Sequence, residues 1–124
     1  MLTLLMPRNI IFYTTETGRR PVEEFLDSLQ SDEAQKISWV LKLIEELDRV
    51  PSQYFKKLTG SEDIWECRAR TKSKAMRIFG FFADGGTLML THGYAKKSQK
   101  TEAREIKLAE KYRKDYLTRK GRLT

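Results

Sequence analysis

The sequence predicts one α+β domain in which helices cover a mostly antiparallel, four-stranded sheet. Three segments between residues 64 and 94 alternate or are rich in β-branched and aromatic residues, and short turn-forming loops separate them. Two segments with helical spacing of apolar residues precede them and one follows. At 124 residues the chain is long enough for one core, so we expect a single domain over residues 1–124 with the order β-α-α-β-β-β-α.

The first third of the chain predicts a strand followed by two helices. Residues 9–15 are β-branched and aromatic, which favours a strand. A short amphipathic helix is expected over residues 21–30, with a proline at its first position. Ser31 is a good N-cap for a second helix to about Asp48, and Pro51 stops it. Two helices joined so closely form a hairpin whose apolar face must cover the sheet.

The remaining segments are a loop, a last helix and the two ends of the chain. We expect residues 52–63 to be a loop and Thr101 to cap a last helix with its lysines and arginines on the outer side. Residues 1–8 are expected to be a loose extension and residues 118–124 a frayed tail.

The central hairpin is where polarity is most informative. Pairing Thr71 with Met76 places Arg70 opposite Arg77 and Trp65 opposite Phe82, and a one-residue slip would mix arginines with core residues. One face is then apolar and the other charged. The apolar face carries Trp65, Cys67 and Ala69, and the charged face carries Glu66, Arg68, Arg70 and Arg77.

The charge balance points to an anionic partner. The net charge is +7 and the pI is about 9.6. Arginines on a strand can hold a phosphate through paired hydrogen bonds. Three lysines (Lys96, Lys97 and Lys100) leave the last strand beside the start of the final helix, where both lysines and the helix N-terminus favour phosphate. An ordinary solvated sheet face and a solvated basic loop are the alternatives.

Four other side chains have two interpretations each. Phe79 and Phe81 share the charged face, where they could stack on unpaired bases or form a second apolar patch. His92 is the one side chain that titrates near neutrality, and it is either a general base or a histidine hydrogen-bonded at a strand end. A bulge near Gly93 would turn it out of the core. Glu66 could pair with Arg68 or act as a base.

Composition also argues against several classes. With one cysteine and one histidine, we expect no internal disulfide, no structural metal and no cofactor. Cys67 is expected to be a buried core residue. There is no signal-peptide pattern and no apolar run that could cross a membrane, which predicts a soluble cytoplasmic protein.

Three runs resemble a known family. The runs KKLTGSEDIWECRAR, MRIFGFF and LTHGYAKKSQKTEAREI resemble the phage-derived Gp49-like branch of the RelE/HigB toxin superfamily, over about Ile10 to Tyr116. The resemblance implies a RelE-like fold and the toxin of a type II toxin–antitoxin pair. Such a toxin cleaves mRNA on the ribosome, and its antitoxin carries a helix-turn-helix domain.

Site residues follow from the same resemblance. It implies Arg68 as the basic residue of the second strand, Arg77 as the phosphate-contacting arginine of the third, and Lys96 and Lys97 as the basic pair after the fourth. Glu66 stands where some relatives have a basic residue. No tyrosine follows Lys97 at the place where relatives stack one on a base.

The expected activity is therefore that of a metal-independent endoribonuclease, in which a ribose 2′-hydroxyl attacks the adjacent phosphate. Arg68, Arg77 and His92 are the expected catalytic residues, and substrate binding is assigned to Arg70, Lys96, Lys97 and Lys100. Two alternatives remain: a non-catalytic gyrase inhibitor similar to the ParE relatives, and a basic RNA-binding module.

Overall fold

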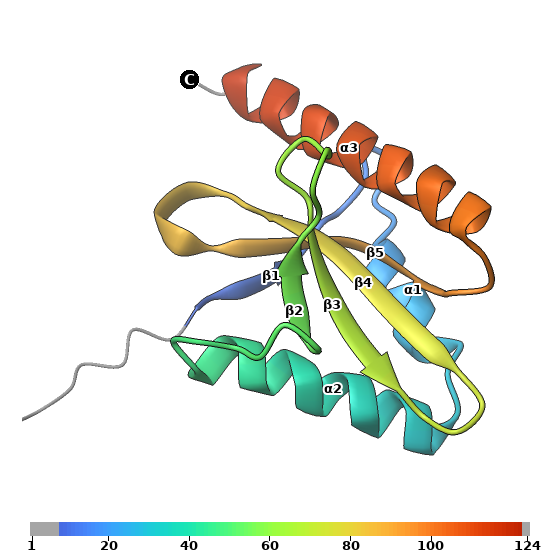
Figure 1. Ribbon diagram of the computed structural model, residues 1–124. Coiled ribbons are helices and arrows are strands. Elements are labelled where there is room, and N and C mark those ends of the chain that lie inside the picture. The colour runs from blue at the N-terminus through green and yellow to red at the C-terminus, as the bar shows by residue number, and fades with distance from the viewer. Residues whose placement is uncertain (1–7, 123–124) are drawn as a thin grey trace, which may run out of the picture.

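The computed structural model describes residues 8–122, apart from the side chains of residues 100 and 101 (Figure 1). Its elements confirm the α+β class. In chain order they are β1 (Ile10–Phe12), α1 (Pro21–Asp27), α2 (Ser31–Glu46), β2 (Phe55–Lys57), β3 (Trp65–Arg70), β4 (Ala75–Phe82), the 3-10 turn η1 (Asp84–Gly86), β5 (Leu88–Ala95) and α3 (Gln99–Arg122).

The described sheet has five strands in the order β1-β5-β4-β3-β2, one more than the sequence predicted. The strands pair antiparallel except at one edge, where β1 runs parallel to β5. The additional strand, β2, lies inside the segment that was expected to be a loop. It has only three residues, and two of them are exposed lysines, so it carries no alternating pattern. Its pairing with β3 makes it a strand.

The register of the central hairpin differs from the prediction by two residues. Trp65 pairs with Gly80 and Arg70 pairs with Ala75, because the Thr71 N–H donates to the Lys74 carbonyl at 2.9 Å and closes the turn early. A shift of two residues leaves every side chain on its predicted face. Polarity therefore identified the two faces correctly but could not identify the register.

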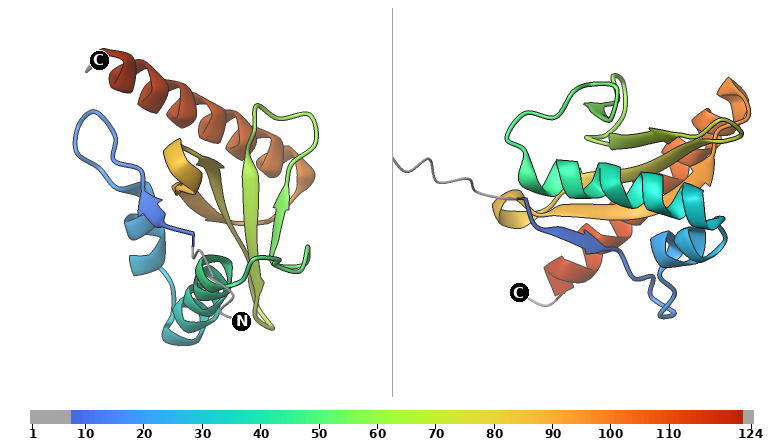
Figure 2. Two further views of the ribbon diagram at one scale, coloured as in Figure 1. Left: turned by 90° about the vertical axis from the view of Figure 1, so that its left-hand side faces the viewer. Right: turned by 90° about the horizontal axis from the view of Figure 1, so that it is seen from below.

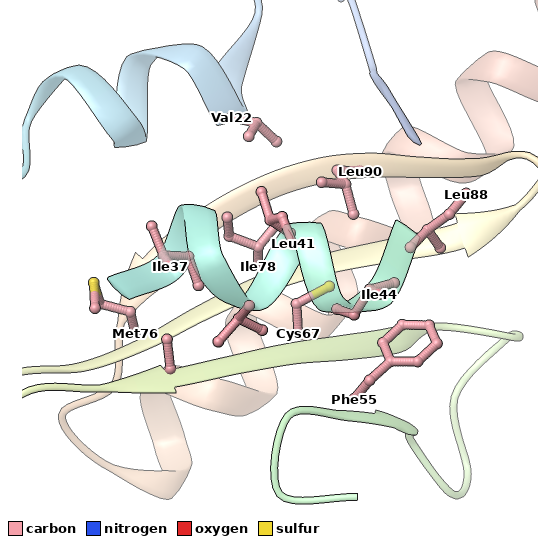
Figure 3. Close-up of a cluster of buried hydrophobic side chains, with 12 residues drawn as sticks. Val22, Ile37, Leu41, Ile44, Phe55, Cys67, Met76, Ile78, Leu88 and Leu90 are labelled. Carbon is pink, nitrogen blue, oxygen red and sulfur yellow. The ribbon is translucent and has the colours of Figure 1, made fainter. Parts of the chain in front are cut away.

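The sheet is the middle of three layers. Helices α1 and α2 lie on one side of it and α3 crosses the other (Figures 1 and 2). The first core fills the space between α2 and the sheet, where Cys67 is fully buried as predicted (Figure 3). A second core lies under α3. It consists of Tyr13, Leu58, Ile64, Phe79, Phe81, Met89, Tyr94 and Ala109.

Local signals set the helix boundaries. Proline occupies the first turn of α1 as expected, but α1 ends at Asp27. The N-cap of α2 is Gln30 rather than Ser31, because Gln30 and Glu33 form a reciprocal capping box in which the Gln30 N–H donates to the Glu33 carboxylate at 2.9 Å. Helix α3 begins at Gln99, two residues before the expected cap.

The described residues at both ends of the chain are tied to the fold. Arg8 donates from its guanidinium to the carbonyls of Ile44 and Asp48, at 2.8 and 2.7 Å, and so caps the C-terminus of α2. At the other end α3 continues to Arg122, where an ion pair between Lys120 and Asp84 ties it to the sheet. Residues 1–7 and 123–124 lie outside the described part of the chain. Within residues 8–122, every helix is too short or too polar to cross a membrane.

Candidate functional site

A cavity opens at the edge of β3, just beyond the point where β2 stops covering it. Phe55 is the first paired residue of β2, and the Arg68 N–H makes one further bond to the Tyr54 carbonyl at 2.8 Å. The preceding chain turns away because the Tyr54 N–H donates to the Pro51 carbonyl at 2.9 Å. The cavity that remains has a volume of about 330 Å³. Its lining residues, which we call the basic pocket, are Lys36, Gln53, Tyr54, Arg68, Ala69, Arg70 and Arg77.

Cations dominate this pocket. Lys36 comes from α2, Arg68 and Arg70 from β3 and Arg77 from β4, and none of the lining residues is acidic. A concave site with several charges of one sign concentrates the opposite charge. Guanidinium groups can each donate two parallel hydrogen bonds to phosphate oxygens. The pocket therefore offers several hydrogen-bond donors of positive charge to an anion such as phosphate.

Behind the arginines lies a buried carboxylate. Glu66 is 2% exposed, and its two oxygens lie 3.3 Å from Nε of Arg68 and 3.5 Å from Nε of Arg77. Arg77 is almost as buried, and it also donates from Nη1 to the Met76 carbonyl at 3.0 Å. Burial raises the pKa of Glu66, against the opposing effect of the two arginines. The site thus places arginine guanidinium groups beside a carboxyl group whose pKa is raised.

The start of α3 borders the same network. Tyr94 is the strand partner of Arg77, and its buried hydroxyl has no hydrogen-bond partner among the described residues. Burial, and then the nearby Glu102, raise the pKa of Tyr94. Lys96 is paired with Glu102 at 3.3 Å. Lys96 therefore lies at the beginning of α3, beside the network and outside the lining of the basic pocket.

His92 lies elsewhere, between β5 and α3. Its Nε2 is 2.7 Å from the Glu105 carboxylate and its Nδ1 is 3.2 Å from the Thr91 hydroxyl. Burial lowers the pKa of His92, and Glu105 opposes this shift. A bulge does turn the side chain toward α3, but it falls at Thr91, between the pairs Phe79–His92 and Gly80–Leu90, and not near Gly93. His92 contributes to a second cavity, between α1 and α3, and not to the basic pocket.

The structure brings together only some of the predicted site residues. Arg68, Arg70 and Arg77 share the basic pocket. His92, Lys96 and Lys97 do not line it, and the side chain of Lys100 is outside the described part. Phe79 and Phe81 are fully buried beneath α3, so they form the second apolar patch and present no surface to a base.

Three lining residues escaped the sequence analysis. In the sequence Lys36 is one of several charged residues on the outer side of an amphipathic helix, and Gln53 and Tyr54 fall in a predicted loop. A tyrosine next to a phenylalanine and two lysines was the available signal. Recognising it required knowing that the segment pairs with β3.

Fold and site together define a small basic α+β protein with a pocket of cationic side chains at one sheet edge. Residues 24–114, about three quarters of the chain, match the family described as phage derived protein Gp49-like (DUF891). The chain therefore belongs to the Gp49-like family, which is associated with toxin–antitoxin systems, and the family resemblance seen in the sequence is confirmed. No curated protein matches the chain.

Proposed function

We propose that this protein is the toxin of a type II toxin–antitoxin pair and that it cuts mRNA on the ribosome. The observation that carries the proposal is the basic pocket, in which three arginines from two neighbouring strands stand in front of the buried Glu66. Membership of the Gp49-like family supports the toxin assignment. The cognate antitoxin, expected to carry a helix-turn-helix domain, and a cytoplasmic location belong to the same proposal.

The proposed reaction is an internal transesterification. The ribose 2′-oxygen attacks the adjacent phosphorus, the bond to the 5′-oxygen breaks, and the leaving 5′-oxygen takes a proton from water. The products are a cyclic phosphate and a free 5′-hydroxyl. Arg68, Arg70 and Arg77 stabilise the charge that grows on the phosphate oxygens. Glu66 accepts the proton of the 2′-hydroxyl, a role that its raised pKa favours. These side chains supply a base and charge stabilisation, so the proposed reaction uses no metal.

Arg68 has the freedom that this reaction requires. Its side chain is about one third exposed, and its pairing with Glu66 is long at 3.3 Å. An incoming phosphate competes with Glu66 for the guanidinium, so Arg68 can move to the phosphate and leave one carboxylate oxygen free. Arg77 is fixed by the Met76 carbonyl and stays in place. We therefore assign the proton transfer to Glu66 rather than to His92, and binding of flanking nucleotides to Lys96 and Lys97.

The proposal is tested by expressing the free protein and mapping the 5′ ends of cellular mRNA. The expected result is growth arrest with new 5′ ends inside translated regions. The double variant R68A/R70A should lose both effects, whereas K111A/K114A, which changes two exposed lysines of α3 outside the pocket, should retain cleavage. Intact transcripts with accumulated DNA damage would contradict mRNA cleavage and favour gyrase inhibition instead.

A further inference from the structure

An exposed tryptophan stands at the rim of the basic pocket. Trp39 lies on α2, 44% exposed, with the Lys36 ammonium 4.5 Å from its ring centroid. The ring of Tyr54 meets it edge to face, with centroids 5.4 Å apart. Lys36 and Tyr54 both line the basic pocket, so the indole is placed where the pocket meets the outer surface of α2.

The core of the protein does not need this indole. The buried stripe of α2 runs through Ile37, Val40 and Ile44, and Trp39 lies off that stripe. The other tryptophan, Trp65, differs in this respect, because it stacks on Phe55 and packs against the first core. An indole that leaves nearly half of its surface in water beside an anion pocket has a large apolar face available to a ligand.

We propose that Trp39, together with Tyr54 and Lys36, forms a nucleobase subsite for single-stranded RNA. The inference rests on the proposed function: the phosphate of a nucleotide occupies the basic pocket, and its base stacks on the indole at the rim. Stacking tolerates every base, because every base has a flat π-face. The amide of Gln53, which also lines the pocket, is the group placed to hydrogen-bond a base edge.

Charge decides between RNA and a protein partner at this rim. The Lys36 ammonium lies over the indole, and lysine is depleted at the centre of protein interfaces. An aromatic ring beside a cationic groove is the combination with which proteins bind single strands. Lys36 then moves from the indole face to the phosphate when the base arrives.

The protein has two tryptophans, so the variant W65F makes Trp39 the only indole reporter. The probe is a short, single-stranded 2′-O-methyl RNA, which can bind but lacks the attacking hydroxyl. The control ligand is an abasic chain of equal length and charge. We expect the RNA to quench Trp39 emission and the abasic chain to leave it unchanged. In the wild-type background W39A should weaken RNA binding roughly 5- to 150-fold, while W39F retains most of the affinity.

The outcomes separate this subsite from the proposed function. If R68A/R70A weakens RNA binding and W39A does not, the phosphate pocket stands and the base subsite is wrong. Equal binding of the abasic chain also overturns the subsite. A parent protein that does not bind the oligonucleotide would also overturn the subsite. Mapping of the 5′ ends of cellular mRNA would then still test mRNA cleavage independently. Circular dichroism of W39A, whose side chain is exposed, checks that the fold is intact.

Discussion

Glu66 and Arg77 face each other from neighbouring strands with both side chains almost completely buried, 3.5 Å apart from Oε2 to Nε. The sequence placed Arg77 on a charged face where solvent would reach it, and the structure instead encloses it under the start of α3. Removing one member of a buried ion pair is costly, because the charge of the remaining member loses part of its compensation. Arg77 is therefore a structural residue as well as a candidate for phosphate binding.

Arg77→Ala should lower the free energy of unfolding by about 3–5 kcal/mol, since it leaves the buried Glu66 without its second arginine. Urea denaturation followed by circular dichroism measures this. Arg68→Ala is the matched comparison: its side chain is partly exposed, so solvent screens its pairing with Glu66 and its loss should cost less than the loss of Arg77. Equal stability of the two variants would contradict the buried pair. Any loss of toxicity in Arg77→Ala has to be judged against this structural effect.

The outer lysines of α3 should act on binding strength alone. Lys111 and Lys114 are exposed and lie outside the basic pocket. Replacing either with alanine should weaken RNA or ribosome binding modestly and reduce the salt dependence of the binding constant by about one phosphate contact at most. Titrations at several salt concentrations measure this slope. Complete loss of mRNA cleavage in either variant would place the active site on α3 instead of the sheet.

Cys67 should be unreactive in the folded protein. It is fully buried among core residues, and burial raises the pKa of its thiol, so both access and thiolate formation are suppressed. A bulky thiol reagent should label it only after denaturation, as mass spectrometry of native and denatured samples would show. Rapid labelling of the native protein would mean that Cys67 is not on the face that α2 covers.

The stability of the protein should include a contribution from His92 that acid removes. Burial lowers the pKa of His92 in the folded state, so the unfolded chain takes up its proton at higher pH than the folded one. This contribution is complete above a pH of about 6.5 and is lost as the pH falls below it. On acidification from about pH 7 to about pH 5, the free energy of unfolding of the wild type should therefore fall relative to that of H92Q.

Glu105 provides the control for this titration. Its carboxylate opposes the effect of burial on the pKa of His92, so E105Q should lower that pKa further and make the loss of stability on acidification larger. Urea denaturation at both pH values, for the wild type and the two variants, gives the comparison. A wild type that gains stability relative to H92Q on acidification would reverse the sign and contradict the placement of His92.

Gly93→Ala should be destabilising by about 1–3 kcal/mol through overpacking. A Cβ atom at Gly93 would lie 2.3 Å from Cδ2 and 2.7 Å from Cγ of Phe25, so α1 would have to move away from β5. Gly121→Ala is the matched control, because at that position near the end of α3 no atom beyond its chain neighbours and the helix's own backbone lies within 4 Å of the added carbon, so the variant should not be destabilised. Thermal unfolding of both variants tests the contrast, and an unchanged midpoint for Gly93→Ala would contradict the close contact.

Elements whose apolar residues recur at a helical or strand period could be predicted from the sequence, and elements without such a repeat could not. The three long strands, the three helices and the two faces of the hairpin follow from periodicity, and all were predicted correctly. Strand β2 has no such pattern, and the two-residue register error in the hairpin preserves the alternation that was used to set it. The end of α3 was wrong because its ion pair to Asp84 comes from a turn distant in the sequence.

The same limit applies to the site. Arg68, Arg70 and Arg77 were correctly grouped because adjacent strands bring them to one face. Burial could not be predicted: the sequence leaves open whether α3 covers His92 or leaves it exposed. Pairing of Glu66 with Arg68 was one of its interpretations, but the burial of Glu66 was not foreseen. Lys36 and Tyr54 belong to the pocket through tertiary packing alone.

The turn at Pro51 decides whether the pocket exists at all. Because it diverts the chain after a single hydrogen bond past β2, the outer edge of β3 is left open beside Arg70. Had β2 continued by two residues, backbone pairing would have filled that space. Side-chain substitutions can therefore tune how strongly the pocket binds, whereas lengthening or shortening the connection between α2 and β2 would create or erase it. Insertions and deletions at this one connection are the changes by which such a fold gains or loses its site.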